Sequence, residues 1–343
     1  MKTECAGKGG CLQRDSVEHG EYAEVYSTEI READRKDGAD LLEKVLNRGN
    51  LNRAYKRVKA NKGASGVDGM TVDEALPWLK EHREELLDLI RNGKYKPPLV
   101  RRVEIPKDNG GVRKLGIPTV IDRIIQQAIA QVLKPIYEPK FSDGSYGYRS
   151  HRSAKDAILK VKEYAEEGYT RAVCLDLSKY FDTLNHELLM NMLREEIKDK
   201  RLIDLIKKYL KSGVMENGIV MRTDEGSPQG GNLSPLLANI YLDKFDKEFE
   251  GRGVKVIRYA DDILLLAKSI RAAERLLGTS TAYLEKELKL KVNIEKSRAI
   301  SVYSIRNFDF SALRWKGTER VHISEFTQSR RRKPKKTAKA NFP

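Results

Sequence analysis

Apolar residues recur every three or four positions through most of the chain after position 40, and this spacing predicts amphipathic helices. The clearest helix begins at Thr119, where Thr119 and Asp122 form a helix-start signal ahead of isoleucines on one face. Pro235 directly after Ser234 marks another start, because proline is favoured at the first helical position. Helices are predicted over residues 41–46, 51–58, 71–92, 119–133, 153–167, 186–197, 202–210, 234–249 and 271–288.

Shorter apolar runs bounded by turn residues predict strands, and two pairs of these runs predict β-hairpins. The glycines of segment 107–111 suit the turn of the first hairpin, and Ala260–Asp262 forms the turn of the second. Asn217-Gly218 signals a further tight turn. Strands are predicted over residues 99–106, 112–117, 172–177, 254–259, 263–267 and 291–293. This mixture of helices and strands predicts an α+β fold.

Chain length and cysteine usage narrow the class of protein. At 343 residues the chain exceeds the roughly 250–300 residues at which one core tends to divide, so two lobes are expected. No apolar run approaches the roughly 20 residues of a membrane helix, and the first residues lack a secretion signal. Three cysteines, none at zinc-finger spacing, exclude a disulfide framework. We therefore expect a cytoplasmic protein that does not enter membranes.

The formal net charge of +15 is distributed unevenly. Residues 1–40 are net acidic and read as a polar extension, whereas residues 314–343 hold ten basic and two acidic residues. A basic surface attracts polyanions, of which nucleic acid is the usual one. Solubility alone would also explain such a charge, so the choice between nucleic-acid binding and mere solubility depends on the candidate catalytic residues.

Three carboxylates supply that chemistry. Asp176 ends a predicted buried strand, and Asp261 and Asp262 lie at the tip of the second predicted hairpin. Ionised carboxylates beside a core are costly unless a cation compensates them. Three of them at one sheet edge would suit a hard divalent cation such as Mg²⁺, and a pair of such ions suits nucleotidyl transfer. An isolated Asp-Asp turn would more simply be a solvated hairpin tip.

Six segments, in matching order, resemble bacterial group II intron reverse transcriptases (intron-encoded maturases), and the resemblance covers about residues 41–304. The segments are Asn61–Gly69, Arg101–Gln127, Ser145-Tyr-Gly-Tyr-Arg149, Leu175-Asp-Leu-Ser-Lys-Tyr-Phe-Asp182, Gly226-Ser-Pro-Gln-Gly-Gly-Asn-Leu-Ser-Pro235 and Tyr259-Ala-Asp-Asp262.

The resemblance implies the fingers and palm of a right-hand polymerase, the palm being an antiparallel sheet with helices packed on one face. It divides the chain into an extension (1–40), mainly fingers (41–170), mainly palm (171–305) and a divergent basic tail (306–343). The implied activity is RNA-directed DNA synthesis with two Mg²⁺ ions, which Mn²⁺ could replace. The implied partners are an RNA template (group II intron RNA), a DNA or RNA primer and dNTPs; a homodimer stays open.

The resemblance also implies roles for single residues. Asp176 and Asp261 would be the principal metal ligands, Asp262 an auxiliary carboxylate, and the carbonyl of Leu177 a further ligand. Phe181 falls where the family places an aromatic ring that excludes a ribose 2′-hydroxyl; core packing is the alternative role. Asp182 reads as a turn residue rather than a fourth ligand.

Basic and amide side chains complete the expected site. Lys107 and Arg113 flank the turn of the first hairpin and would clamp the triphosphate, since arginine suits bidentate phosphate contacts. Gln229 would contact the nucleotide, and Lys296 matches a lysine near the departing pyrophosphate. Solvated surface positions are the alternative for Lys107, Arg113 and Lys296, and an ordinary loop before a helix is the alternative for Gln229.

Arg123 and Arg149 would meet the template or nucleotide. Structural ion pairs are the alternative role for both arginines.

The resemblance ends after Ser304. Where the family has a primer-grip hairpin and a helical thumb, this chain has Arg306–Leu313 and then a tail with the basic run Arg330–Lys336. We therefore expect no complete thumb, and a C-terminus replaced through a frameshift or, alternatively, a genuine RNA-binding tail. A non-catalytic RNA-binding maturase fragment or an inactive relic is the alternative to a working polymerase.

Overall fold

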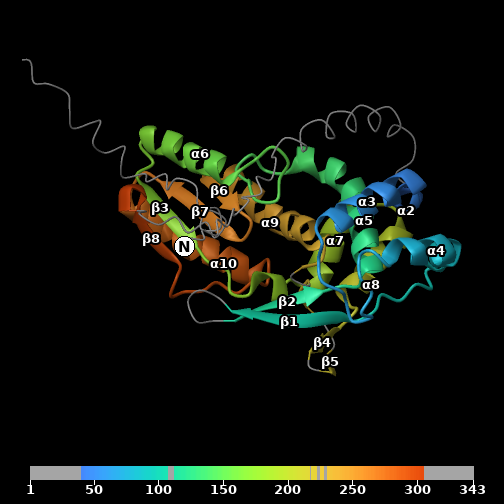
Figure 1. The fold of residues 1–343 in the computed structure, drawn as a ribbon. Helices are drawn as coiled ribbons and strands as arrows, with labels where there is room; N and C mark the ends of the chain where they lie inside the picture. The colour runs from blue at the N-terminus through green and yellow to red at the C-terminus, as the bar shows by residue number, and fades with distance from the viewer. Residues whose placement is uncertain (1–39, 107–111, 217, 222–224, 228–229, 305–343) are drawn as a thin grey trace, which may run out of the picture. The chain divides into compact units, whose positions relative to one another are not determined.

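The computed structural model describes residues 40–106, 112–216, 218–221, 225–227 and 230–304 (Figure 1). The expected N-terminal extension, primer-grip segment and basic tail lie outside the described residues. Most predicted helices are confirmed. The α-helices are α2 (Leu41–Leu46), α3 (Arg48–Ala60), α4 (Ala75–Arg91), α5 (Val120–Tyr137), α6 (Ala154–Glu166), α7 (His186–Glu196), α8 (Lys200–Leu210), α9 (Ser234–Gly251) and α10 (Ile270–Lys286).

One four-stranded sheet is antiparallel throughout, as expected for the palm. Its strands are β3 (Arg171–Leu175), β6 (Lys255–Tyr259), β7 (Asp262–Ala267) and β8 (Arg298–Ser301), in the order β6-β7-β3-β8. The predicted hairpin of β6 and β7 is confirmed, and its last pair joins Tyr259 to Asp262. Strand β3 lies between β7 and β8, with Leu175 opposite Ile263.

Helices cover both faces of this sheet, so the expectation of helices on one face is wrong. Leu264 and Leu266 belong to a core that includes residues of α6, whereas Ile263 and Leu265 belong to the larger core that includes α9. An unbroken apolar run from Ile263 to Ala267, rather than an alternating one, is the sequence signature of a strand buried on both faces.

A second four-stranded sheet has the order β2-β1-β4-β5. The predicted hairpin of β1 (Val100–Pro106) and β2 (Val112–Ile117) is confirmed, and β4 (Val214–Glu216) with β5 (Ile219–Met221) forms another. Strand β4 pairs with β1 in parallel, so this sheet combines segments more than 100 residues apart. The division between fingers and palm at residues 170/171 remains a prediction.

Local helix starts follow the sequence signals with two exceptions. Thr119 accepts a hydrogen bond from the Asp122 amide at the start of α5, and Ser153 with Asp156 forms a full capping box at α6. Helix α4 begins at Ala75 rather than at Thr71. The Glu74 carboxylate accepts hydrogen bonds from the amide and the hydroxyl of Thr71, which keeps the residues before the helix in a turn. Ser234 is already helical, and its hydroxyl meets that of Ser227.

Two strand predictions need correction. The expected strand 291–293 is reduced to a single antiparallel bridge between Leu177 and Val292. The outer strand β8 was not predicted at all, because its residues Arg298–Ser301 lack a distinct apolar run.

No helix among the described residues has the length and apolar character needed to cross a membrane.

Asp199 joins two helices of the larger core and generates a testable prediction. Its carboxylate is buried, accepts from the Leu42 amide of α2 at 2.9 Å and caps α8 by accepting from Arg201. Asp199→Ala should lower the free energy of unfolding by about 2 kcal/mol in urea titrations, because a cap and a buried hydrogen bond are both lost. Asp204→Ala, on the exposed side of α8, should change it by less than about 0.5 kcal/mol. Equal effects of the two variants would contradict this role.

Candidate active site

Asp176 directly follows β3, and its backbone is fixed on both sides. The Asp176 amide donates to Ser297 Oγ at 3.1 Å, and its carbonyl accepts from the Asn293 amide at 2.8 Å. The side chain is 37% exposed, and Lys296 Nζ lies 3.7 Å from Oδ2. The segment after α10 therefore brings a lysine to the carboxylate that the sequence singled out. Ser297 and Asn293 were not predicted as supporting residues; Asn293 ends the predicted strand 291–293, and Ser297 follows it.

The β6–β7 hairpin carries the other two carboxylates. Its loop consists of two residues, Ala260 and Asp261, and Ala260 has φ +58°, in the left-handed region. Two-residue hairpin loops need positive φ because their twist must match that of the strands. Asp262 begins β7, and the β3–β7 pairing ends with Leu175 opposite Ile263, so Asp176 directly follows, and Asp262 directly precedes, the last paired residue of its strand.

The electrostatic surroundings agree with this placement. Burial raises the pKa of the Cys174 thiol to about 11, and the Asp262 carboxylate adds to that effect. Burial also raises the pKa of the Tyr180 hydroxyl, with a further contribution from the Asp261 charge. Tyr180 is fully buried and donates to the Ala238 carbonyl of α9 at 2.7 Å. The charge of Asp262 thus acts on Cys174 and that of Asp261 on Tyr180, two residues that are close to Asp176 in the chain.

These residues offer the donors that a hard divalent cation prefers, namely carboxylate and carbonyl oxygens. The bridge between Leu177 and Val292 is made by the neighbours of Leu177: Ser178 donates to Lys291, and Asn293 donates to Asp176. The Leu177 carbonyl is therefore directed away from this bridge. Within the part of the chain that the structure describes, no group of three or more acidic, histidine or cysteine side chains is already arranged to hold a metal ion. The backbone arrangement fits a metal, and the carboxylate side chains would have to turn toward it.

Phe181 lies in η2 (Tyr180–Asp182), directly after the Asp176 segment. Its ring is half-buried, packs against the larger core and lies 5.4 Å from the Tyr180 ring. Its carbonyl accepts from the Ser227 amide, which links it to the Gly226–Pro235 segment. The position agrees with both roles considered for Phe181, a steric gate and a packing residue.

Glycines of the Gly226–Pro235 segment allow close backbone contact. Gly226 has φ +90°, and a Cβ there would lie 2.8 Å from the Asp182 carbonyl oxygen. Gly230 has φ +127°, and a Cβ would lie 2.4 Å from the carbonyl oxygen of Gly116 in β2. This segment therefore joins the strand of the first hairpin to the vicinity of Asp176. Asp182 is the last residue of η2, and its Oδ1 lies 3.8 Å from Arg102 Nη2.

Three of the expected nucleotide contacts cannot be placed by their side chains. Lys107 and Gln229 lie outside the described residues, and of Arg113 only the backbone is described, paired with Ile105 in the β1–β2 hairpin.

The two arginines expected at the template are turned inward. Arg149 is 9% exposed: it binds Glu138 Oε1 at 2.6 Å, donates to the Ser142 carbonyl, and stacks over Phe141. For Arg149 the structural ion pair, considered as the alternative, is what the structure contains. Nothing in the sequence identifies Glu138 and Phe141 as partners of Arg149, because these contacts form only in the folded chain.

Arg123 is also buried, and burial lowers the pKa of its guanidinium. It donates to the Ala64 carbonyl at 2.8 Å, while its Nε is buried without a hydrogen-bond partner among the described residues. Arg123 thereby fixes the Asn61–Gly69 loop to α5.

The profile of the family described as reverse transcriptase (RNA-dependent DNA polymerase) matches residues 105–333 of this chain. The chain belongs to the reverse transcriptase family. The matched range contains Asp176, Asp261 and Asp262 and the two segments in which they lie, Leu175–Asp182 and Tyr259–Asp262. Enzymes of this family use divalent metal ions and act on RNA templates and primers.

Curated relatives narrow the assignment to group II intron reverse transcriptases. Group II intron-encoded protein LtrA of Lactococcus lactis subsp. cremoris is 42% identical over 196 residues, covering 57% of this chain and 32% of LtrA. Protein YkfC of Escherichia coli (strain K12) is 36% identical over 288 residues, covering 72% of this chain and 76% of YkfC. The chain thus spans three-quarters of YkfC but only about a third of LtrA, and the predicted resemblance to intron-encoded reverse transcriptases is confirmed.

Among solved structures, a chain of the partial Cas6-RT-Cas1--Cas2 complex is 25% identical, and the match covers 72% of this chain and 43% of that one with a TM-score of 0.46. The fold assignment rests on the strand topology and the family match rather than on this overlap.

The close approach of Gly226 to Asp182 generates a prediction. Gly226→Ala should lower the free energy of unfolding by about 2 kcal/mol or more, because alanine is strained at positive φ and its methyl group would collide with backbone. Gly251→Ala at the end of α9, where a Cβ meets no atom within 4 Å, should be neutral or slightly stabilising. Urea titrations of both variants measure the difference, and an unaffected Gly226→Ala would contradict the close contact.

Proposed function

We propose that this chain is an RNA-directed DNA polymerase of the group II intron type. The single observation that supports it most is the β3–β7 register, which ends with Leu175 opposite Ile263 and so brings the residues next to them, Asp176 and Asp262, to the same edge of the sheet. If the Asp261-Asp262 turn were only a solvated hairpin tip, it would not need a neighbouring strand, β3, that is followed by a third carboxylate. The proposed template is RNA, in particular group II intron RNA, with a DNA or RNA primer; formation of a homodimer belongs to the same proposal.

In the proposed reaction the primer 3′-hydroxyl gives up its proton to water, its oxygen forms a bond to the α-phosphorus of a dNTP, and the bond from that phosphorus to pyrophosphate breaks. Asp176, Asp261, Asp262 and the Leu177 carbonyl would hold Mg²⁺, with Mn²⁺ as a substitute. Bound metal would lower the pKa of the attacking hydroxyl and neutralise phosphate charge. Ser297 and Asn293 keep Asp176 in place by binding its amide and carbonyl.

Lys296 is proposed to act on the leaving group. Its ammonium lies 3.7 Å from Asp176 and is 66% exposed, so it balances a carboxylate while remaining accessible. From this place it would donate a proton to the oxygen of the departing pyrophosphate. Lys107, Arg113 and Gln229 are proposed as further nucleotide contacts, and Arg123 as a residue that holds the Asn61–Gly69 loop for the template.

The polymerase proposal predicts the effect of removing one carboxylate. Wild-type protein should extend a DNA primer on an RNA template with dNTPs and Mg²⁺, whereas Asp261→Asn should lose at least about 10³-fold in rate, because it removes charge needed at the metal. Template binding, measured by filter retention, should remain within about twofold. Asp204→Asn on the exposed side of α8 should match the wild type in both assays.

Two results would contradict the proposal. Extension by Asp261→Asn at the wild-type rate would remove the carboxylate from the reaction. Template binding without any extension by the wild type would favour a non-catalytic RNA-binding maturase fragment.

The gate role of Phe181 predicts a change in sugar selection. Phe181→Ala removes the ring that would collide with a 2′-hydroxyl, so the ratio of kcat/KM for dNTP over NTP should fall by about tenfold or more. If Phe181 only packs against the core, thermal stability should fall while this ratio stays unchanged. The alanine variant of the neighbouring Tyr180, which is buried against α9, serves as the packing control.

A further inference from the structure

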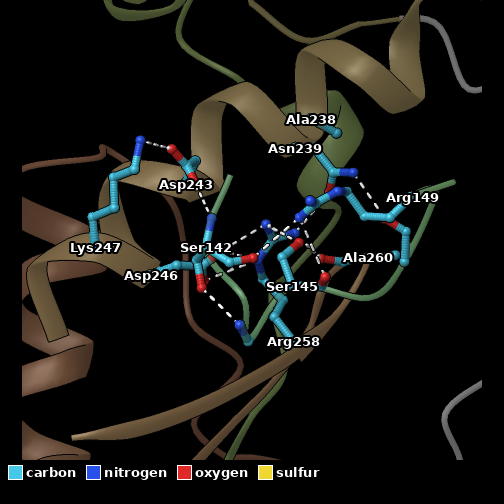
Figure 2. Close-up of polar contacts among 12 residues, drawn as sticks. Ser142, Ser145, Arg149, Ala238, Asn239, Asp243, Asp246, Lys247, Arg258 and Ala260 are labelled. Carbon is cyan, nitrogen blue, oxygen red and sulfur yellow. Dashed lines mark hydrogen bonds and ion pairs between the residues drawn. The ribbon is translucent and has the colours of Figure 1, made fainter. Parts of the chain in front are cut away.

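A fully buried arginine lies immediately before the β6–β7 turn. Arg258 is in the penultimate position of β6, its side chain is 0% exposed, and it is the largest wholly enclosed side chain among the described residues. A buried arginine is costly unless all its donors are used. Figure 2 shows that its neighbours surround the guanidinium on several sides. In the sequence, Arg258 is one of two charged residues, with Lys255, in the predicted strand 254–259.

Helix α9 provides the first two partners of this guanidinium. Asp246 is also fully enclosed and accepts from Arg258 Nε at 2.8 and 3.0 Å, with Nη2 2.7 Å from its Oδ2. Asn239, two turns earlier on α9, accepts from Arg258 Nη1 at 2.9 Å. The helix therefore holds the arginine at two points in a fixed direction.

The remaining contacts lead to the hairpin turn. Arg258 Nη1 also donates to the Ala260 carbonyl at 2.9 Å, and Nη2 donates to Ser145 Oγ at 2.8 Å (Figure 2). Ala260 is the turn residue with left-handed φ, a conformation that alanine does not favour by itself. Its carbonyl belongs to the peptide unit that leads into Asp261.

The segment of Ser145 closes the arrangement from the other side. Tyr146 donates to the Arg258 carbonyl and Arg258 donates to the Gly144 carbonyl, both at 2.8 Å, so this segment pairs alongside β6. The Gly147 carbonyl accepts from Asn239 Nδ2 at 2.8 Å. A Cβ on Gly147 would lie 2.1 Å from the Ala260 nitrogen, so only glycine allows this backbone to lie against the turn.

We infer that Arg258, Asn239 and the Ser145–Gly147 segment are positioning residues that hold the Ala260–Asp261 turn in its left-handed form and so present Asp261 for metal binding. The inference rests on the proposed function, since it concerns the same carboxylate. Apolar residues could fill the same volume with less desolvation, but they could not direct donors at the Ala260 carbonyl. Residues that orient a metal ligand in this way affect metal affinity as well as rate.

Arg258→Lys and Asn239→Ala test the inference. Lysine keeps a cation for Asp246 but has no planar fork to serve Ala260, Asn239 and Ser145 together. Asn239→Ala leaves the Arg258–Asp246 ion pair intact and removes only the amide that links Arg258 to Gly147. Lys244→Ala is the control, because Lys244 lies on the exposed side of the same helix and pairs with Glu195 of α7.

Two quantities are measured for each folded variant. The first is the half-saturating Mn²⁺ concentration, from electron paramagnetic resonance of a complex with RNA template, dideoxy-terminated primer and dNTP. The second is the kcat and KM for dNTP in primer extension. Arg258→Lys should raise the half-saturating Mn²⁺ concentration and lower kcat, each by about 10–100-fold, with a smaller change in KM. Asn239→Ala should also raise the half-saturating Mn²⁺ concentration and lower kcat. Lys244→Ala should match the wild type.

Each outcome decides the inference. Wild-type Mn²⁺ binding and kcat in Asn239→Ala, or an equal shift in Lys244→Ala, would overturn it, even if Arg258→Lys fails to fold. A loss of thermal stability without a change in half-saturating Mn²⁺ would reduce Arg258 to a packing role and also overturn it. Failure of the proposed function is distinguishable, because then Asp261→Asn and wild type would bind Mn²⁺ alike.

Discussion

The antiparallel pairing of β3 with β7 is the constraint on which the candidate site depends. Because Leu175 lies opposite Ile263, two carboxylates that are 86 residues apart in sequence end at the same edge of the sheet. A shift of one residue would turn every side chain of β7 to the other face, moving Leu264 and Leu266 out of the core beneath α6. Burial on both faces therefore fixes the register, and the register fixes the distance between the acidic positions.

Polar contacts then stabilise what the apolar core has aligned. Ser297 and Asn293 hold the backbone of Asp176 from the β8 side. Arg258 holds the opposite turn from within the sheet, with its charge balanced by Asp246 of α9. The exposed Lys296 balances Asp176 from solvent. The candidate site thus combines a buried support with three half-buried carboxylates at the sheet edge.

Much of the fold could be predicted because the signals are local. Helices such as α5 carry a regular apolar face and a capping residue, and the β6–β7 hairpin combines two apolar runs with a short turn. Strand β8 was missed because the Arg298–Ser301 segment gains its strand conformation only by pairing with β3. The inward orientation of Arg149 depends on Glu138 and Phe141, which meet it only after α5 and the following loop have packed. Partners of this kind are tertiary and leave no periodic pattern.

The most direct test of the account is a crystal structure of the chain with RNA template, dideoxy-terminated primer, dNTP and Mn²⁺, with anomalous scattering recorded at the manganese edge. The account predicts anomalous peaks bounded by the carboxylates of Asp176 and Asp261, beside the Leu177 carbonyl, with Asp176 released from Lys296. Manganese bound elsewhere, with Asp176 still paired to Lys296 and the β6–β7 turn remote from the nucleotide, would contradict it.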